Sequence, residues 1–137
     1  MLTLTLLDPI AQDTIREGAT MGLTGKPNMP IFAYKSVNDE ISPIADTDKL
    51  VKQFCNEGVS IKYIREATGE HFTQAATSTG DVINFLTDRF NGKPQTGCTT
   101  QTSFNDLLNP GNAGTLGVNL INVLLNALGT PLGPNHF

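Results

Sequence analysis

One carboxylate and one imidazole occupy positions in the sequence from which they could act together. Asp39 follows the apolar stretch 31–35, and His71 follows a second apolar stretch, 59–64. In open α/β sheets, catalytic groups gather beyond the carboxyl ends of the strands. A carboxylate placed there can hold an imidazole in the tautomer that deprotonates a serine. The two residues therefore predict the acid and the base of a hydrolase, and the competing interpretation is a turn acid and an ordinary surface histidine.

A strand–helix–strand pattern would position these two residues. The stretch Ile31–Lys35 is short, apolar and aromatic, as expected of a buried strand, and 59–64 predicts a second strand with partial alternation. Residues 46–57 predict the helix between them, capped by Asp46 or Thr47 and ended by the glycine that follows. A crossover of this length joins parallel strands, so the predicted fold class is α/β. The helix face that packs on the sheet is formed by Leu50, Val51, Phe54 and Cys55.

The remaining segments predict helices and loops. Residues 8–9, Asp-Pro, predict the start of a short helix that stops near Gly18, ahead of a linker rich in Gly and Pro. His71 is expected in a loop, and a further helix follows it. Residues 91–114 are turn-rich, and 116–128 are apolar enough for a last helix. The helix after the loop is predicted from the spacing of Val82, Ile83, Leu86 and Phe90.

The composition excludes several classes of protein. The 137 residues carry a net charge of −4 and no cluster of Lys or Arg, whereas a nucleic-acid site needs several basic groups on one face. No stretch reaches the ~18 apolar residues of a membrane helix, and the N-terminal MLTLTLL lacks the basic flank and the length of a signal peptide. No Cys or His pair has the spacing of metal ligands, and the glycines of 111–117 are wrongly spaced for a phosphate loop, so neither metal nor cofactor is expected.

Cys55 and Cys98 are the two cysteines of the chain. An even pair is compatible with one disulfide or with two unrelated thiols. Cys55 belongs to the sheet-facing side of its predicted helix, so a buried apolar Cys55 beside an unpaired Cys98 remains open from the residues alone.

Three segments in order carry a resemblance to a known family: YKSVNDEISPIADTDKLVKQFC, GVSIKYIREATGEH and FLTDRFNGKPQTGC. They resemble the C-terminal part of fungal secretory lipases, α/β-hydrolases of the lipase class A type. The resemblance implies that Asp39, rather than the adjacent Glu40, is the acid and that His71 is the base. It also implies a disulfide between Cys55 and Cys98, which indicates an oxidising compartment.

One part of the family pattern is missing. No G-x-S-x-G occurs in the sequence, and Ser36, Ser42 and Ser78 lack the strand–turn–helix context of a nucleophile. We therefore expect the C-terminal portion of an α/β-hydrolase, without the N-terminal half of the sheet. Its expected parts are the end of a cap region with a linker (1–29), a βαβα core with acid and base (30–92), and a disulfide-bearing loop with an apolar tail helix (93–137).

By this resemblance the expected function is that of a secreted triacylglycerol lipase. Its substrate would be a lipid ester met at a transient lipid–water interface rather than in an integral membrane setting, and the missing N-terminal half would supply the serine. Two alternatives stay open: the end of a peptidase or carboxylesterase of the same fold, and a non-catalytic α/β remnant or small binding module. The chain alone is expected to be inactive.

Overall fold

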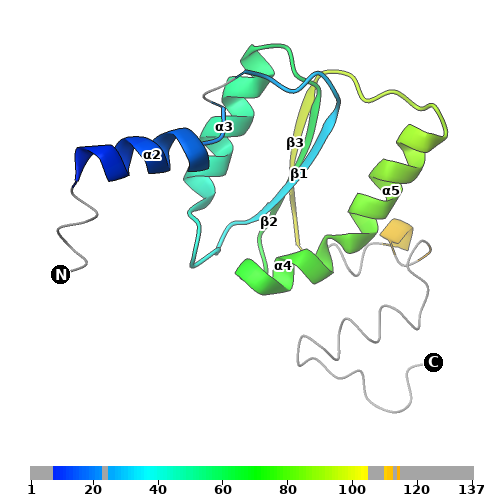
Figure 1. Cartoon of the computed structure of the whole chain (residues 1–137). Helices are drawn as coiled ribbons and strands as arrows, with labels where there is room; N and C mark the ends of the chain where they lie inside the picture. Colours follow the sequence, from blue (N-terminus) through cyan, green and yellow to red (C-terminus); the bar gives the residue numbers. More distant parts are fainter. Residues whose placement is uncertain (1–7, 23–24, 105–109, 113, 115–137) are drawn as a thin grey trace.

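The fold is built on a three-stranded parallel sheet (Figure 1). The computed structural model describes residues 8–22, 25–104, 110–112 and 114. The strands lie in the order β1-β2-β3, and both neighbouring pairs are parallel. The predicted α/β class is thereby confirmed. The predicted helix at 116–128 and the rest of the C-terminal tail lie outside the described residues. The elements are α2 (Pro9–Ala19), β1 (Ile31–Ser36), α3 (Ile44–Asn56), β2 (Ile61–Glu66), α4 (His71–Thr77), α5 (Thr79–Phe90) and β3 (Cys98–Ser103).

Alternate residues of β1 and β2 point to opposite faces of the sheet, because side chains in a strand repeat with a period of two. On one face, Ile61 and Tyr63 of β2 are almost fully buried against Val51 and Phe54 of α3. This is the main core of the described residues, and it uses the helix face that the sequence predicts. The partly buried hydrophobic residues packed around it are Ile31, Ala33, Leu50 and Cys55.

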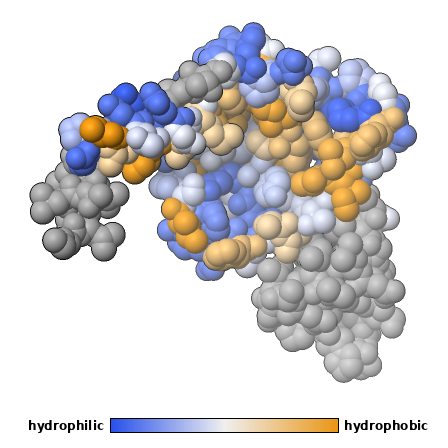
Figure 2. Space-filling view, viewed as in Figure 1, coloured by the Kyte–Doolittle hydropathy of each residue, from blue (hydrophilic) through white to orange (hydrophobic). Residues whose placement is uncertain are grey.

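α5 lies on the other face of the sheet, opposite α3, and α4 lies below the carboxyl ends of the strands (Figure 1). Phe32 of β1 contacts Phe85 of α5, with ring centroids 5.4 Å apart. The helix predicted from residues spaced up to Phe90 is confirmed as α5, which ends at Phe90 with Asn91 as its C-cap. Leu86 and Phe90 are exposed, and the helix buries Gly80, Asp81 and Phe85. Figure 2 shows hydrophobic residues gathered over this side of the molecule.

β3 corrects the prediction of a purely turn-rich segment after residue 91. It pairs with β2 along its whole length, from Ile61 opposite Cys98 to Glu66 opposite Ser103. Its sequence, CTTQTS, has β-branched threonines but no apolar alternation, and almost all its side chains are exposed. An edge strand with solvated side chains leaves no hydrophobic period to detect, which is why the sequence pattern missed it.

The N-terminal cap of α2 is the predicted one, whereas that of α3 differs from the prediction. Asp8 caps α2 by accepting from two backbone N–H groups, as predicted, whereas α3 begins at Ile44, with Pro43 as its N-cap instead of Asp46 or Thr47. Proline presets a backbone angle suited to helix entry, and Asp46 then lies in the first turn, where a carboxylate favours the helix dipole. In the part of the chain that the structure describes, none of the helices is both long and apolar enough to cross a bilayer.

Candidate active site

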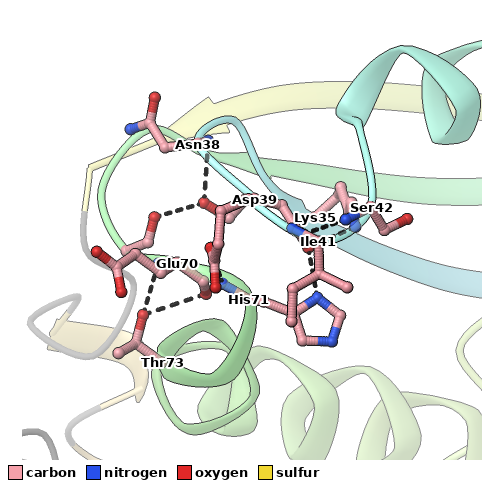
Figure 3. A network of polar contacts seen from close by, with 11 residues as sticks. Lys35, Asn38, Asp39, Ile41, Ser42, Glu70, His71 and Thr73 are labelled. Carbon is pink, nitrogen blue, oxygen red and sulfur yellow. Dashed lines mark hydrogen bonds and ion pairs between the residues drawn. The ribbon is translucent and has the colours of Figure 1, made fainter.

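Asp39 and His71 meet at the carboxyl edge of the sheet, as the sequence predicts. β1 and β2 end in register, with Ser36 opposite Glu66. The loops that follow them carry Asp39 and His71 to the same place, 32 residues apart in sequence. His71 Nδ1 lies 2.8 Å from Asp39 Oδ2 (Figure 3).

Asp39 is held by four donors in a nearly solvent-free position. Its side chain is 1% exposed. Oδ1 accepts from the backbone N–H groups of Ile41 at 2.9 Å and Ser42 at 2.7 Å, which closes an Asx-type turn. Oδ2 accepts from Lys35 Nζ at 2.5 Å and from His71 Nδ1. The carboxylate is therefore fixed in orientation on both oxygens.

The ionised form of Asp39 is strongly favoured. Burial alone would raise the pKa of this carboxyl group, because it disfavours charge. The hydrogen bonds from Lys35, the Ser42 backbone, His71 and the Ile41 backbone act in the opposite direction and hold the pKa well below its usual range. A carboxylate can only accept hydrogen bonds, so Nδ1 of His71 carries the hydrogen and Nε2 is left as the basic nitrogen.

His71 is the first residue of α4 rather than a loop residue, which corrects the expectation for this position. Glu70 is the N-cap and forms a capping box with Thr73, and Glu40 accepts the His71 backbone N–H at 3.1 Å. These two acids thus satisfy N–H groups that the helix start leaves without intrahelical partners. The His71 side chain is 36% exposed, so its ring is accessible from one side.

The two loops are tied to each other as well as to the pair. Ser36 Oγ donates to the Gly69 carbonyl at 2.6 Å, and Asn38 Nδ2 donates to the Ala67 carbonyl at 3.1 Å. Gly69 has φ +100°, a conformation that suits glycine, and a Cβ there would lie 2.9 Å from Thr73 Oγ1. The distance between acid and imidazole is therefore set by backbone-anchored loops.

Sequence reasoning missed two buried charged residues near the pair. Lys35 follows the apolar residues of β1, four residues before Asp39, and a lysine in that position was the available signal. Glu66, the last residue of β2, is fully buried and accepts from Thr77 Oγ1 at 2.5 Å. No pattern of apolar residues indicates which charged side chains turn inward.

Two of the three serines weighed as nucleophiles are buried. Ser36 is buried and donates to a backbone carbonyl, and Ser78 is fully buried at the junction of α4 and α5. Ser42 contributes its backbone N–H to Asp39. Among the described residues, no group of three His, Cys, Asp or Glu side chains is arranged to hold a metal ion.

Cys55 and Cys98 form a disulfide, as the resemblance implies. The bridge joins α3 to the first residue of β3, with the Cα atoms 5.9 Å apart. It therefore fastens the exposed edge strand to the helix that packs on the core.

A family model described as secretory lipase matches residues 5–98, which include both loops and both cysteines. The chain belongs to the secretory lipase family. It is 45% identical over 111 residues to Lipase A of Arthroderma benhamiae, and 32% identical over 120 residues to the secreted triacylglycerol lipase LIP1 of Malassezia furfur. These matches cover 80% and 84% of this chain, but only 24% and 25% of the relatives.

The fold agrees with that of a solved family structure. Lipase A of Candida antarctica in its closed state matches with a TM-score of 0.71 and 26% identity, over 98% of this chain and 34% of that one. A trichothecene C-3 esterase of Fusarium sporotrichioides is 33% identical over 88 residues, covering 64% of this chain and 20% of that protein. The chain thus spans about a quarter of the length of these two lipase relatives.

Proposed function

We propose that this chain forms the acid and base part of a secreted triacylglycerol lipase that uses a Ser-His-Asp mechanism. The observation that carries the proposal is the 2.8 Å contact between His71 Nδ1 and a buried, ionised Asp39. Asp39 orients the ring, and His71 is the general base. The similarity to lipases along most of the chain supports ester hydrolysis as the reaction.

In the reaction, His71 Nε2 takes the proton of a serine hydroxyl while the serine oxygen attacks the ester carbonyl carbon. The imidazolium then gives that proton to the glycerol oxygen as the carbon–oxygen bond breaks, and the acyl group stays esterified to the serine. Water, deprotonated by the same nitrogen, hydrolyses this acyl ester and restores the serine. Asp39 stabilises the imidazolium in both steps without accepting its proton.

The nucleophile is proposed to lie in a part of the protein outside this chain. Support comes from the short share of each relative that the chain covers and from the burial of Ser36 and Ser78. The disulfide fits a protein that matures in an oxidising, extracellular setting. A lipid–water interface is the proposed place of action.

A second candidate substrate is a small non-lipid ester. The match to a trichothecene C-3 esterase favours it, because this relative shares the family pattern over 64% of the chain. Both candidates use the same acid and base, so a panel of esters with short and long acyl chains separates them. Turnover of long-chain triacylglycerol emulsions supports the lipase, and turnover confined to short soluble esters supports the esterase.

The test uses the complete protein, meaning this chain joined to the region that supplies the nucleophile. His71→Ala and Asp39→Asn are each expected to lower kcat by about 10³- to 10⁴-fold, the loss typical of a triad member. Asp88→Asn is the control, because Asp88 is a surface carboxylate on α5 paired with Lys93. Full activity of His71→Ala would refute the proposed base, and rapid turnover by the 137-residue chain alone would place the nucleophile within it.

A further inference from the structure

Lys35 is a buried cation in contact with the acid of the proposed site. Its side chain is 10% exposed, and its Nζ donates to Asp39 Oδ2 at 2.5 Å. The same oxygen accepts from His71 Nδ1 at 2.8 Å, whereas Oδ1 is occupied by two backbone N–H groups. The lysine and the histidine therefore share one oxygen atom of one carboxylate (Figure 3).

We propose that Lys35 is a positioning residue for ester hydrolysis, which shares Asp39 Oδ2 with His71 and thereby keeps the imidazole neutral and ready to accept a proton. The inference rests on the proposed function and adds to it a determinant of the working pH. A protonated imidazole and a lysine ammonium on one oxygen repel each other, since like charges a few ångströms apart disfavour each other in a poorly solvated site.

The other charged groups around His71 are acids. Glu40 accepts the His71 backbone N–H, Glu70 caps α4, and Glu66 lies buried at the end of β2 beneath the same helix. With Asp39, these carboxylates would favour a protonated imidazole. Among the described residues, Lys35 is the only lysine or arginine paired with Asp39, so it is the group that opposes them.

Lys35 also explains how Asp39 stays ionised while buried. A carboxylate removed from water needs a counter-charge or several donors. The hydrogen bond from Lys35 is the strongest of the contacts that lower the Asp39 pKa. The contact between Lys35 and Asp39 therefore has two effects. It keeps the Asp39 carboxylate charged, and it weakens the net attraction of that carboxylate for a protonated His71.

The test is the pH dependence of kcat/KM in the complete protein with Lys35→Met, which removes the charge and keeps an unbranched side chain. We expect the acid limb of the profile to move upward by about one pH unit. This is the lower end of the effect of a charge within ~4–6 Å, because His71 is partly exposed and water screens it. Lys52→Met, which removes an exposed lysine on the outer side of α3, is expected to leave the acid limb in place.

A purely structural salt bridge predicts a different result. It predicts that Lys35→Met lowers thermal stability and scales activity down equally at every pH, with the acid limb unmoved, and that outcome would overturn the inference. If Lys35→Met does not fold, Lys35→Gln provides the same test, because it keeps a neutral donor and should show the same upward movement. Loss of the proposed function itself is recognised separately, since His71→Ala would then retain activity.

Discussion

Breaking the disulfide between Cys55 and Cys98 should remove a large share of the stability of this part of the molecule. The bridge ties the start of β3 to α3, across a sequence separation of 43 residues. The side chains of β3 are mostly exposed, and among the described strands it pairs only with β2. Little hydrophobic burial would hold β3 in place once the cross-link is gone.

The expected loss follows from the closed loop. Cross-linking a chain across 43 residues lowers the entropy of the unfolded state, by an amount equivalent to about 4 kcal/mol at 25 °C in the chain-entropy model. The whole free energy of unfolding of a small domain is only about 5–15 kcal/mol. The loss should therefore bring the 137-residue chain close to the limit of stability.

The measurement is guanidinium denaturation of the 137-residue chain, followed by far-UV circular dichroism, in the oxidised and reduced states. The reduced protein retains both cysteine side chains and so separates the cross-link from the packing of Cys55. Hydrogen exchange should show the amides of β3 losing protection before those shared by β1 and β2. A difference below about 1 kcal/mol between the two states would refute the chain-entropy reasoning.

Three other substitutions test local packing and charge. Gly80→Ala would place a Cβ 2.6 Å from Asn112 Cβ and should lower the free energy of unfolding, by about 1–3 kcal/mol as for an overpacked core. A Cβ at Gly18 would have no neighbour within 4 Å, so Gly18→Ala should raise the free energy of unfolding by about 0.5–1 kcal/mol. Thermal denaturation that shows both glycine variants stabilised, or both destabilised, would contradict the geometry. The lowered pKa of Asp39 means that its stabilising contribution is fully present above its usual pKa and is lost as the pH falls toward the folded-state value. Asp39→Asn should therefore lower the free energy of unfolding at neutral pH, and the variant and the unchanged protein should become more similar in stability below about pH 4. If urea denaturation gives the same difference between the two proteins at every pH, this account is wrong.

Much of the architecture could be predicted from local pattern. The apolar stretch before Asp39, the amphipathic helix with Val51 and Phe54, and the glycine after that helix all express short-range rules of burial and turn geometry. These rules need only the period of a strand or a helix. The prediction that Asp39 and His71 meet needed one further step, because parallel strands bring their carboxyl ends to one edge.

Other features could not be read from pattern. β3 is polar and exposed, so it carries no hydrophobic period, although it completes the sheet. The start of α3 moved by two residues because Pro43, rather than a side-chain cap, begins the helix. β3 and the start of α3 both depend on backbone pairing or backbone geometry, which the side-chain pattern does not indicate.

The sequence alone determined the α/β class, since this depends on periods within a few residues. It predicted Asp39 and His71 as acid and base from their places after two strands and from the family resemblance. Only the tertiary structure decided that Lys35 joins them on Asp39 Oδ2 and that Glu66 is buried beneath α4. The physical reason is that burial of a charge is set by what packs over it. The burial of Lys35 and Glu66 is therefore a property of three-dimensional packing, which residue spacing along the chain does not contain.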